Sequence, residues 1–315
     1  MKAILGKKIL KMVDITHKIT TLRTAVAQAI VKVGSAETIQ AILDKKVPKG
    51  DVLEVARTAG LFAVKNTASV IPDCHPMPIE YTGIHFECFE DFIQIEVTVK
   101  TIYKTGVEVE AMHGASIVAL TMYDMLKPID KNVEISTVKL LHKKGGKSDY
   151  ITNQNLNLNV AVLICSDSVS SGKKKDSAGK IVTEKLEKLG LTISNYDIIP
   201  DEIREIQASV NQLCNKKADL IILTGGTGLS KRDVTPEAIL PLIDRRIPGI
   251  EEAIRSYGQE RTPFAMLSRS VVGFKGKTLL MALPGSTNGA AESIDAVFPS
   301  VLHLFQLLNG FDHGK

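Results

Sequence analysis

The segment "LTGGTGLSKRDVTPEAI", residues 223–239, carries residue types that could bind phosphate and a metal ion. Three glycines follow an apolar run that is typical of a buried strand, and they are Gly225, Gly226 and Gly228. A glycine-rich turn between a strand and a helix lets backbone N–H groups approach phosphate. The spacing fits neither common phosphate motif, because Ser230 stands where a P-loop needs glycine and Lys231 stands where a dinucleotide fingerprint needs it.

Polar side chains and glycine-containing turns follow the ends of four predicted strands in the second half of the chain. They are Ser166, Asp167, Asp201, Gly225, Gly226, Thr227, Gly228, Pro284, Gly285 and Ser286. Ligands of parallel α/β sheets bind beyond the carboxyl ends of the strands, so we expect a nucleotide site there. The glycine turns would bind phosphate, and the neighbouring aspartates Asp167, Asp201 and Asp233 could hold Mg²⁺. The alternatives are a plain turn at the glycines and a solvated loop at residues 173–175.

In the first half of the chain, one stretch places a carboxylate and an ammonium group at helical spacing. His113, Ile117, Leu120, Asp124 and Lys127 recur every three or four residues, so they form one stripe along a helix. The stretch is apolar almost all round, which predicts a buried helix. An Asp/Lys pair in a cleft can act as general acid and base, because each group shifts the pKa of the other. A structural ion pair explains the spacing equally well.

Three further groups could surround this pair. His75 lies between two prolines that fix the direction of its ring. Glu108 and Glu110 share one face if their segment is extended. Lys143, Lys144 and Lys147 surround a Gly-Gly turn that could cradle an anion. Each group alone has a simpler explanation, namely a half-buried histidine, a solvated strand face and a solvated turn. A triphosphate-handling site is the one interpretation that uses all of them.

The elements that position these residues differ between the two halves of the chain. In the first half we expect helices near 35–45, 51–71 and 111–126 and strands near 79–89, 93–103 and 133–141. This is an α+β pattern with a largely antiparallel sheet, and Asp51 with Glu54 has capping-box spacing at the second helix. In the second half, strands near 160–165, 191–199, 218–223 and 269–283 alternate with helices near 177–189, 202–216, 235–243, 249–260 and from 286. That alternation predicts an α/β domain with a mostly parallel sheet covered on both faces.

Composition excludes several classes of protein. The 315 residues suffice for two domains, which we place at 1–150 and 160–315 with an Asn-rich linker at 151–159. A net charge of +4 is too small an excess for a nucleic-acid-binding protein. The four cysteines form no C-x-x-C pair, which argues against a disulfide framework and a structural zinc site. Lysines interrupt the first apolar runs, so we expect neither a signal peptide nor a membrane partner. We therefore expect a cytoplasmic protein.

Five segments of the first half resemble the MoaC family, the cyclic pyranopterin monophosphate synthases of molybdenum cofactor biosynthesis. They are "KGDVLEVARTAG", "IPDCHPMPI", "KTGVEVEAM", "ALTMYDMLK" and "KKGGKS", and the resemblance covers about residues 12–148. It implies a ferredoxin-like α+β domain whose active sites form at dimer interfaces within a hexamer. The implied reaction converts a cyclised dihydroguanosine triphosphate into cyclic pyranopterin monophosphate with loss of pyrophosphate.

This resemblance also implies roles for individual residues. Asp124 is implied as the catalytic acid/base and Lys127 as its partner. The residues implied to line the substrate, bind its phosphates or support them are Asp14, Lys49, Asp73, Cys74, His75, Glu108, Val109, Glu110, Lys143 and Lys147. Asp73 departs from the family, which usually has an apolar residue there. A carboxylate beside a triphosphate is unfavourable unless it faces away or binds a metal.

Six segments of the second half resemble the MoaB/MogA family of molybdopterin adenylyltransferase-like proteins. They are "SDSVSSGKKKDSAG", "IPDE", "TGGTGLSKRDVTPEAI", "PGIEEAIR", "LSRS" and "LPGST", within residues 159–308. The resemblance implies a Rossmann-like domain that trimerises and adenylylates molybdopterin with Mg²⁺ and ATP, neither held covalently. It assigns function to Asp201 and Asp233 and phosphate binding to the glycine turn and Ser286. The alternative is a non-catalytic pterin-binding or assembly module.

Together the two resemblances predict a bifunctional molybdenum cofactor biosynthesis protein. Its partners would be pterin and nucleotide substrates and further copies of the chain, in a trimer or a hexamer.

Overall fold

The computed structural model describes residues 12–146, 149 and 157–308. The chain divides into two compact units, one ending at Asp149 and the other beginning at Tyr150, and each is described by itself. Most of the linker predicted at 151–159 lies outside the described residues.

The N-terminal unit is built on a four-stranded antiparallel sheet with the strand order β2-β3-β1-β4. The strands are β1 (Thr21–Lys32), β2 (Tyr81–Cys88), β3 (Phe92–Tyr103) and β4 (Glu134–Lys144). The predicted antiparallel sheet is confirmed, but its central strand β1 was not predicted. The buried side of β1 is formed largely by alanines, such as Ala25, Ala27 and Ala29 at 0% exposure, and alanine is depleted in strands.

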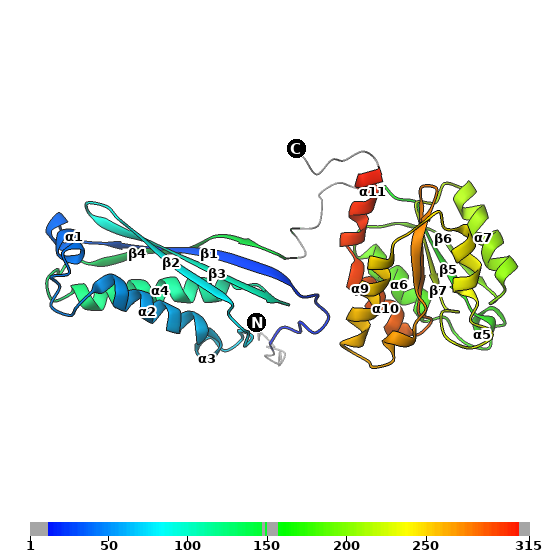
Figure 1. Ribbon diagram of the computed structural model, residues 1–315, viewed down its shortest axis with the longest axis horizontal. Helices are drawn as coiled ribbons and strands as arrows, with labels where there is room; N and C mark the ends of the chain where they lie inside the picture. The colour runs from blue at the N-terminus through cyan, green and yellow to red at the C-terminus, as the bar shows by residue number, and fades with distance from the viewer. Residues whose placement is uncertain (1–11, 147–148, 150–156, 309–315) are drawn as a thin grey trace, which may run out of the picture. The chain divides into compact units, whose positions relative to one another are not determined.

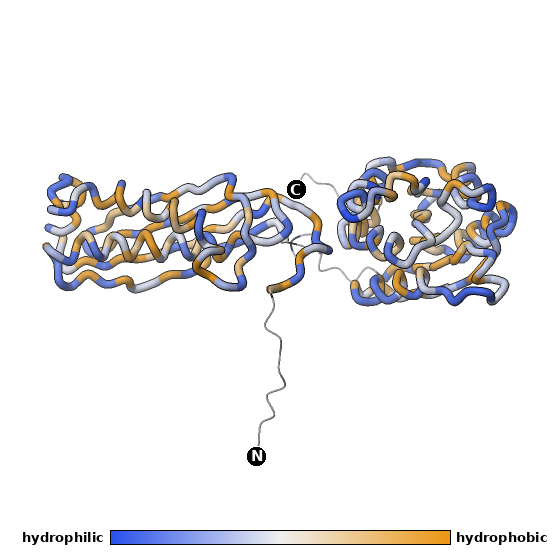
Figure 2. The backbone as a smooth tube through the Cα atoms, turned by 90° about the horizontal axis from the view of Figure 1, so that it is seen from below, coloured by the Kyte–Doolittle hydropathy of each residue, from blue (hydrophilic) through white to orange (hydrophobic). Residues whose placement is uncertain are grey.

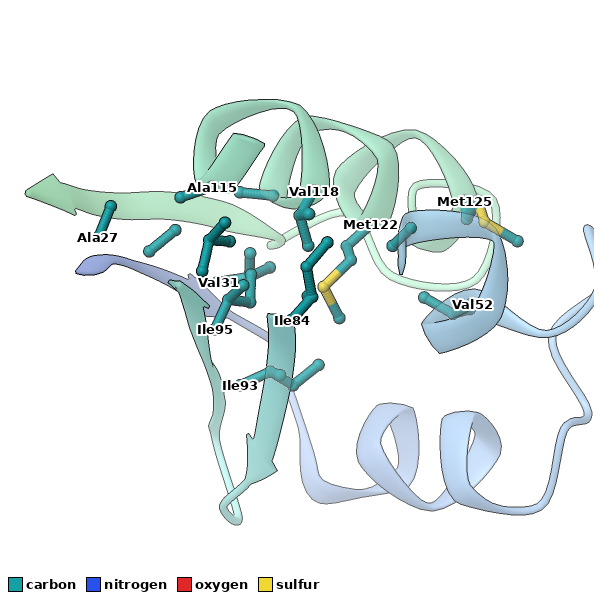
Figure 3. Close-up of a cluster of buried hydrophobic side chains, with 14 of the residues drawn as sticks. Ala27, Val31, Val52, Ile84, Ile93, Ile95, Ala115, Val118, Met122 and Met125 are labelled. Atoms are coloured by element: carbon teal, nitrogen blue, oxygen red, sulfur yellow. The ribbon is translucent and has the colours of Figure 1, made fainter. Parts of the chain in front are cut away.

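Helices cover one face of this sheet (Figure 1). They are α1 (Ala36–Leu43), α2 (Val52–Lys65), α3 (Thr67–Val70) and α4 (Glu108–Leu126). The predicted start of α2 is confirmed, because the Asp51 side chain accepts a hydrogen bond from the Glu54 N–H at 3.2 Å. Close packing of α2 on α4 requires glycine, since a Cβ on Gly60 would lie 2.4 Å from Val118 Cγ2. Figure 3 shows Val118 and Met122 of α4 above the strand residues Val31, Ile84 and Ile95.

Two expectations about α4 are wrong. The helix begins at Glu108 rather than near residue 111, so Glu108 and Glu110 occupy its first turn and not an extended segment. It is also not buried all round, because Leu120 is 52% exposed and Tyr123 is 40% exposed. The ferredoxin-like class that the MoaC resemblance implies stays a prediction.

The C-terminal unit is an α/β domain with a six-stranded sheet of order β6-β5-β7-β10-β9-β8. The strands are β5 (Val160–Cys165), β6 (Ile193–Ile199), β7 (Leu220–Thr224), β8 (Arg245–Arg246), β9 (Val271–Lys275) and β10 (Thr278–Leu283). The neighbours β6, β5, β7 and β10 are parallel, whereas β9 and β8 add antiparallel pairs at one edge. The predicted mostly parallel sheet is confirmed.

Helices cover both faces of this second sheet (Figure 1). They are α5 (Asp167–Ser170), α6 (Ala178–Glu187), α7 (Ile203–Asn215), α8 (Thr235–Ile239), α9 (Pro248–Gln259), α10 (Thr287–Val297) and α11 (His303–Leu308). Alternate residues of β5 separate the two cores: Val162 packs with α6, α9 and α10, and Leu163 packs with α7 and α8. Figure 2 shows hydrophilic residues along the outer helices and loops of this unit. No helix in the described part of the chain is both long and apolar enough to cross a membrane.

Candidate functional sites

The start of α4 and the segment before β2 form a pocket in the N-terminal unit. Cys74 Sγ donates a hydrogen bond to Glu110 Oε1 at 2.9 Å, and His75 Nε2 lies 2.7 Å from the carbonyl oxygen of Val13. Asp73, Glu108 and Val109 line the same pocket, so the structure brings these six predicted residues together. Glu110 is only 2% exposed, and its buried Oε2 has no hydrogen-bond partner among the described residues. A buried acceptor without a partner is available to a ligand.

Burial controls the ionisation of this pocket. Burial and the hydrogen bond to Glu110 raise the pKa of the Cys74 thiol to about 12, so Cys74 is a neutral donor at physiological pH. Burial also raises the pKa of Glu110. Burial is the largest single influence on Glu108 and would raise its pKa too. The 2.8 Å hydrogen bond from Lys143 Nζ, a backbone hydrogen bond and the charges of Lys143 and Arg23 together outweigh burial and lower that pKa. Glu108 therefore stays ionised, whereas Glu110 is the carboxyl group that can take up a proton.

A second, cationic pocket adjoins the first and shares Lys18, Gly106 and Glu108 with it. Its basic lining residues are His17, Lys18, Arg23, Lys104, Lys143 and Lys144. Of these the sequence singled out Lys143 and Lys144. It missed Arg23 and Lys18, because Arg23 lies on the unpredicted strand β1 and Lys18 precedes it. Lys147 lies outside the described residues. Asp14 instead binds its own turn, accepting hydrogen bonds from the N–H and hydroxyl of Thr16 at 2.8 and 2.7 Å.

The predicted acid–base pair is present at the other end of α4. Asp124 Oδ1 lies 2.7 Å from Lys127 Nζ, and Asp124 Oδ2 lies 2.6 Å from Lys49 Nζ. Lys127 first, and then Lys49, lower the pKa of Asp124 to about 2. The expectation of a buried pair is wrong for the single unit, because the side chains of Asp124 and Lys127 are 53% and 51% exposed. His113 of the same stripe is hydrogen-bonded to Thr67, with 3.1 Å between Nδ1 and Oγ1.

The two groups of the N-terminal unit do not meet within one chain. Glu110 and Asp124 are fourteen residues apart on one helix, which corresponds to about 21 Å along its axis. The structure thus assembles Cys74, His75 and Glu110 at one end of α4 and Lys49, Asp124 and Lys127 at the other.

In the C-terminal unit, the ends of β5, β6, β7 and β10 surround one pocket. Ser166, Asp201, Gly225, Gly226, Asp233 and Gly285 line it together, as the sequence predicted for neighbouring strand ends. Gly225 has φ +107°, and a Cβ there would lie 2.2 Å from the carbonyl oxygen of Cys165, so only glycine fits. A Cβ on Gly285 would lie 2.9 Å from Gly225 Cα, so the two glycine turns touch.

The other predicted residues of this unit lie beside the pocket rather than among its described lining residues. Ser286 Oγ caps α10 by accepting the Gly289 N–H at 3.2 Å, and Pro284 accepts from the Thr224 hydroxyl at 2.9 Å. Both Pro284 and Ser286 line a neighbouring cavity between α9 and the start of α10. The carbonyl oxygens of Thr227 and Gly228 accept hydrogen bonds from Arg269 at 3.0 and 2.8 Å, which makes them part of the turn's support.

The carboxylates at the strand ends form a connected network. The Asp167 and Asp201 backbone N–H groups each donate to the side chain of the other, at 3.1 Å in both directions. Burial, and the charges of Asp167 and Asp233, raise the pKa of Asp201. Asp233 Oδ2 accepts the Ser230 N–H at 2.7 Å. The sequence did not single out Arg232, which lies 2.7 Å from Asp167 Oδ2 and 3.0 Å from Glu202 Oε1.

This donor set fits Mg²⁺. Asp201 Oδ1 is buried and has no hydrogen-bond partner in the described structure, so it can accept a ligand. No group of three or more His, Cys, Asp or Glu side chains that could hold a metal occurs among the described residues. Mg²⁺ suits such a site, since it commonly binds one or two carboxylates and completes its shell with phosphates and water.

Residues 12–146 match the MoaC family, and residues 161–303 match a family described as "Probable molybdopterin binding domain". The "Molybdenum cofactor biosynthesis bifunctional protein" of Chlorobaculum tepidum is 40% identical over 303 residues, which cover 96% of this chain and 96% of that protein. The chain belongs to the family of molybdenum cofactor biosynthesis bifunctional proteins.

Other relatives agree with this assignment to the bifunctional family. The protein of the same name from Synechococcus elongatus is 35% identical and covers 96% of this chain and 99% of its own length. The "Cyclic pyranopterin monophosphate synthase" of Geotalea uraniireducens is 50% identical over 139 residues, 44% of this chain and 86% of that protein. A crystal structure of MoaB from Thermus thermophilus is 39% identical and covers 49% of this chain and 98% of its own, with a TM-score of 0.47. On the two family matches and the two full-length relatives, the chain is a biosynthetic enzyme with a MoaC-family N-terminal unit and a MoaB/MogA-like C-terminal unit.

Proposed function

We propose that the N-terminal unit converts a cyclised dihydroguanosine triphosphate into cyclic pyranopterin monophosphate and pyrophosphate. The arrangement around Asp124 carries this proposal. The carboxylate is ionised at neutral pH, which is the form that can accept a proton from the substrate, although the two lysines make it a weak base by lowering its pKa. Lys127, at 2.7 Å, is an ammonium group that returns a proton to the rearranging ring. Lys49 holds the carboxylate from the other side and fixes its direction.

The leaving pyrophosphate needs cations, and the pocket beside β1 supplies them. Lys18, Arg23 and Lys143 line this pocket together with further lysines, so it can bind the phosphates of the substrate. The neighbouring pocket presents the Cys74 thiol and the unpartnered Glu110 oxygen, which suit the polar edge of a pterin ring.

We further propose that two copies of the chain complete each active site. The Asp124 pair of one copy would face the Glu110 pocket of a second copy, because the two groups are about 21 Å apart along a single α4. The exposed Leu120 and Tyr123 lie on the same helix near Asp124 and supply apolar surface for such a contact. The expected trimer or hexamer would repeat this pairing around a threefold axis.

Subunit mixing tests this proposal. Asp124→Asn and Glu110→Gln should each abolish most product formation, measured as pyrophosphate release. When the two variants are mixed and allowed to exchange subunits, activity should return to about a quarter of wild type, since half of the pairs are mixed and each has one intact site. Asp44→Asn is the matched control, because Asp44 is also paired with a lysine, at 2.8 Å from Lys46 Nζ, outside both pockets. No recovery on mixing would contradict the shared site.

For the C-terminal unit, we propose that it binds ATP with Mg²⁺ and adenylylates molybdopterin. The glycine turn offers backbone N–H groups to phosphate, while Asp201 and Asp233 hold the cation. Bound Mg²⁺ would neutralise charge on the phosphates. The unpartnered Asp201 Oδ1 is the observation that carries this part of the proposal.

A product assay tests the adenylyl transfer. The full-length protein, incubated with molybdopterin, ATP and Mg²⁺, should form adenylylated molybdopterin and pyrophosphate. Asp201→Asn should lower the rate by at least about tenfold, because loss of residues that only support a metal ligand already costs about ten- to a hundredfold. Binding of molybdopterin by the wild type without any product would instead indicate a pterin-binding module.

A further inference from the structure

The segment after α5 lines the C-terminal pocket together with the glycine turn. Lys174 and Lys175 of this segment line the pocket together with Gly225 and Gly226. The segment was expected to be a solvated loop, and these lysines are indeed exposed, yet two of them face the pocket. A P-loop places its lysine beside the glycine turn, but Lys231 of this turn is not among the described lining residues.

The pocket is lined by carboxylates, so a bound polyphosphate needs cations such as these two lysines. The lining includes the carboxylates of Asp176, Asp201 and Asp233, which repel a polyphosphate unless cations offset them. Two nearby arginines are already engaged. Arg232 pairs with Asp167 and Glu202, and Arg269 pairs with Glu237 and with backbone carbonyl groups. In the described part of the chain, Lys174 and Lys175 are the cations that line the pocket.

The backbone of the lysine segment is fixed at both ends while its ammonium groups stay available. The Lys174 N–H donates to the carbonyl oxygen of Ser168 at 2.9 Å. On the other side, Asp176 accepts the Gly179 N–H at 2.9 Å, and the hydroxyls of Ser177 and Thr287 lie 2.6 Å apart. The described structure records no hydrogen bond or ion pair for either lysine side chain. The segment therefore presents two unpaired cations from an anchored backbone.

We propose that Lys174 and Lys175 bind the terminal phosphates of the nucleoside triphosphate and replace the P-loop lysine in this pocket. The proposal rests on the proposed nucleotide binding. Backbone N–H groups of the glycine turn bind one part of the phosphate chain, and the two lysines bind the part that faces them. AMP lacks the terminal phosphates, so the two lysines should contribute to the binding of ATP and not to that of AMP.

Calorimetric titration of the full-length protein with ATP and with AMP, in excess Mg²⁺, tests this proposal. Lys174→Ala and Lys175→Ala should each weaken ATP binding about tenfold, and the double variant about a hundredfold, because each loses a charge-assisted contact. AMP binding should change less than about twofold in all three variants. Lys173→Ala is the matched control, since it removes the same charge from the same segment but does not line the pocket.

Each outcome is decisive. If the wild type binds ATP but the double variant binds it equally well, the lysine assignment is wrong and the proposed nucleotide site stands. The lysine assignment is also wrong if Lys173→Ala weakens ATP binding as much as the two pocket variants do. The loss of affinity would then follow from the lower positive charge of the whole segment and not from contacts in the pocket. If the wild type binds no ATP at all, both the lysine assignment and the proposed adenylyl transfer are overturned. Circular dichroism of each variant verifies that the fold is unchanged.

Discussion

Gly226 and Thr235 are in such close contact that a Cβ on Gly226 would lie 2.3 Å from Thr235 Oγ1. The same Cβ would lie 2.8 Å from Asp201 Oδ1, and Gly226 has φ +62°. Thr235 is fully buried, and its hydroxyl oxygen has no hydrogen-bond partner in the described structure. The absence of a side chain at Gly226 therefore keeps the glycine turn next to two buried oxygens.

Gly226→Ala should destabilise the C-terminal unit by about 3 kcal/mol, since the left-handed backbone and the steric clash both oppose a methyl group. Gly190→Ala is the control, because Gly190 has φ +82° with nothing within 4 Å of its Cβ position. Gly190→Ala should lower the free energy of unfolding only by the cost of placing alanine in a left-handed backbone conformation, about 1 kcal/mol. Urea denaturation followed by circular dichroism measures both, and equal losses would show that the contact with Thr235 is unimportant.

The ionisation of Asp124 should follow its two lysine partners. Its folded pKa of about 2 lies below the ordinary value of 3.8, with Lys127 as the largest cause. A depressed pKa favours the folded state above the unfolded pKa, so this contribution is lost as the pH falls from about 4 towards 2. Lys127→Met should raise the pKa of Asp124 towards its ordinary value, as measured by NMR titration of the carboxyl carbon. An unchanged titration curve in Lys127→Met would contradict the pairing.

Cys74 should react slowly with alkylating reagents. Its pKa of about 12 leaves little thiolate at pH 8, since the thiolate fraction falls about tenfold for each unit of pKa. Glu110→Gln removes a carboxylate that raises this pKa, so alkylation of Cys74 by iodoacetamide should become about tenfold faster. Cys88, whose pKa is raised by burial alone, is the internal control in the same mass spectrum and should not change. A Cys74 rate that does not respond to Glu110→Gln would rule out the Sγ–Oε1 contact in solution.

Glu251 should be a major contributor to the stability of the C-terminal unit. It is 1% exposed, and its two oxygens lie 2.9 Å from Nε and NH2 of Arg246, while its Oε1 also accepts the Val272 N–H at 3.0 Å. Glu251→Ala should lower the free energy of unfolding by about 2 kcal/mol, because it leaves the buried Val272 N–H without an acceptor and removes the ion-pair partner of the half-exposed Arg246. Glu252→Ala, at the exposed neighbouring position, should change it by less than about 0.5 kcal/mol. Thermal and urea unfolding of both variants measure this difference.

Local sequence patterns predicted most elements but not all. The apolar runs of β5, β7 and β10 are fully buried on both faces, so they stand out as strands without any knowledge of their neighbours. The strand β1 was missed because alanine is depleted in strands. These positions carry small side chains because α4 packs against them, and that contact appears only in the folded structure. Glu108 and Glu110 looked extended by their spacing, whereas the helix starts early enough to include both.

The sequence by itself determined the chemical groups: the glycine turn, Asp201 with Asp233, Asp124 with Lys127, and the Cys74–Glu110 region. These follow from residue type and short spacing, which a linear sequence records directly. Only the tertiary structure decided which groups meet, because contacts between distant segments depend on strand order and helix length. It joined the ends of β5, β6, β7 and β10 into one pocket, and separated Asp124 from Glu110 along a rigid helix. It also brought Lys174 to the glycine turn, since the order of strands in the sheet, not distance in sequence, sets such neighbours.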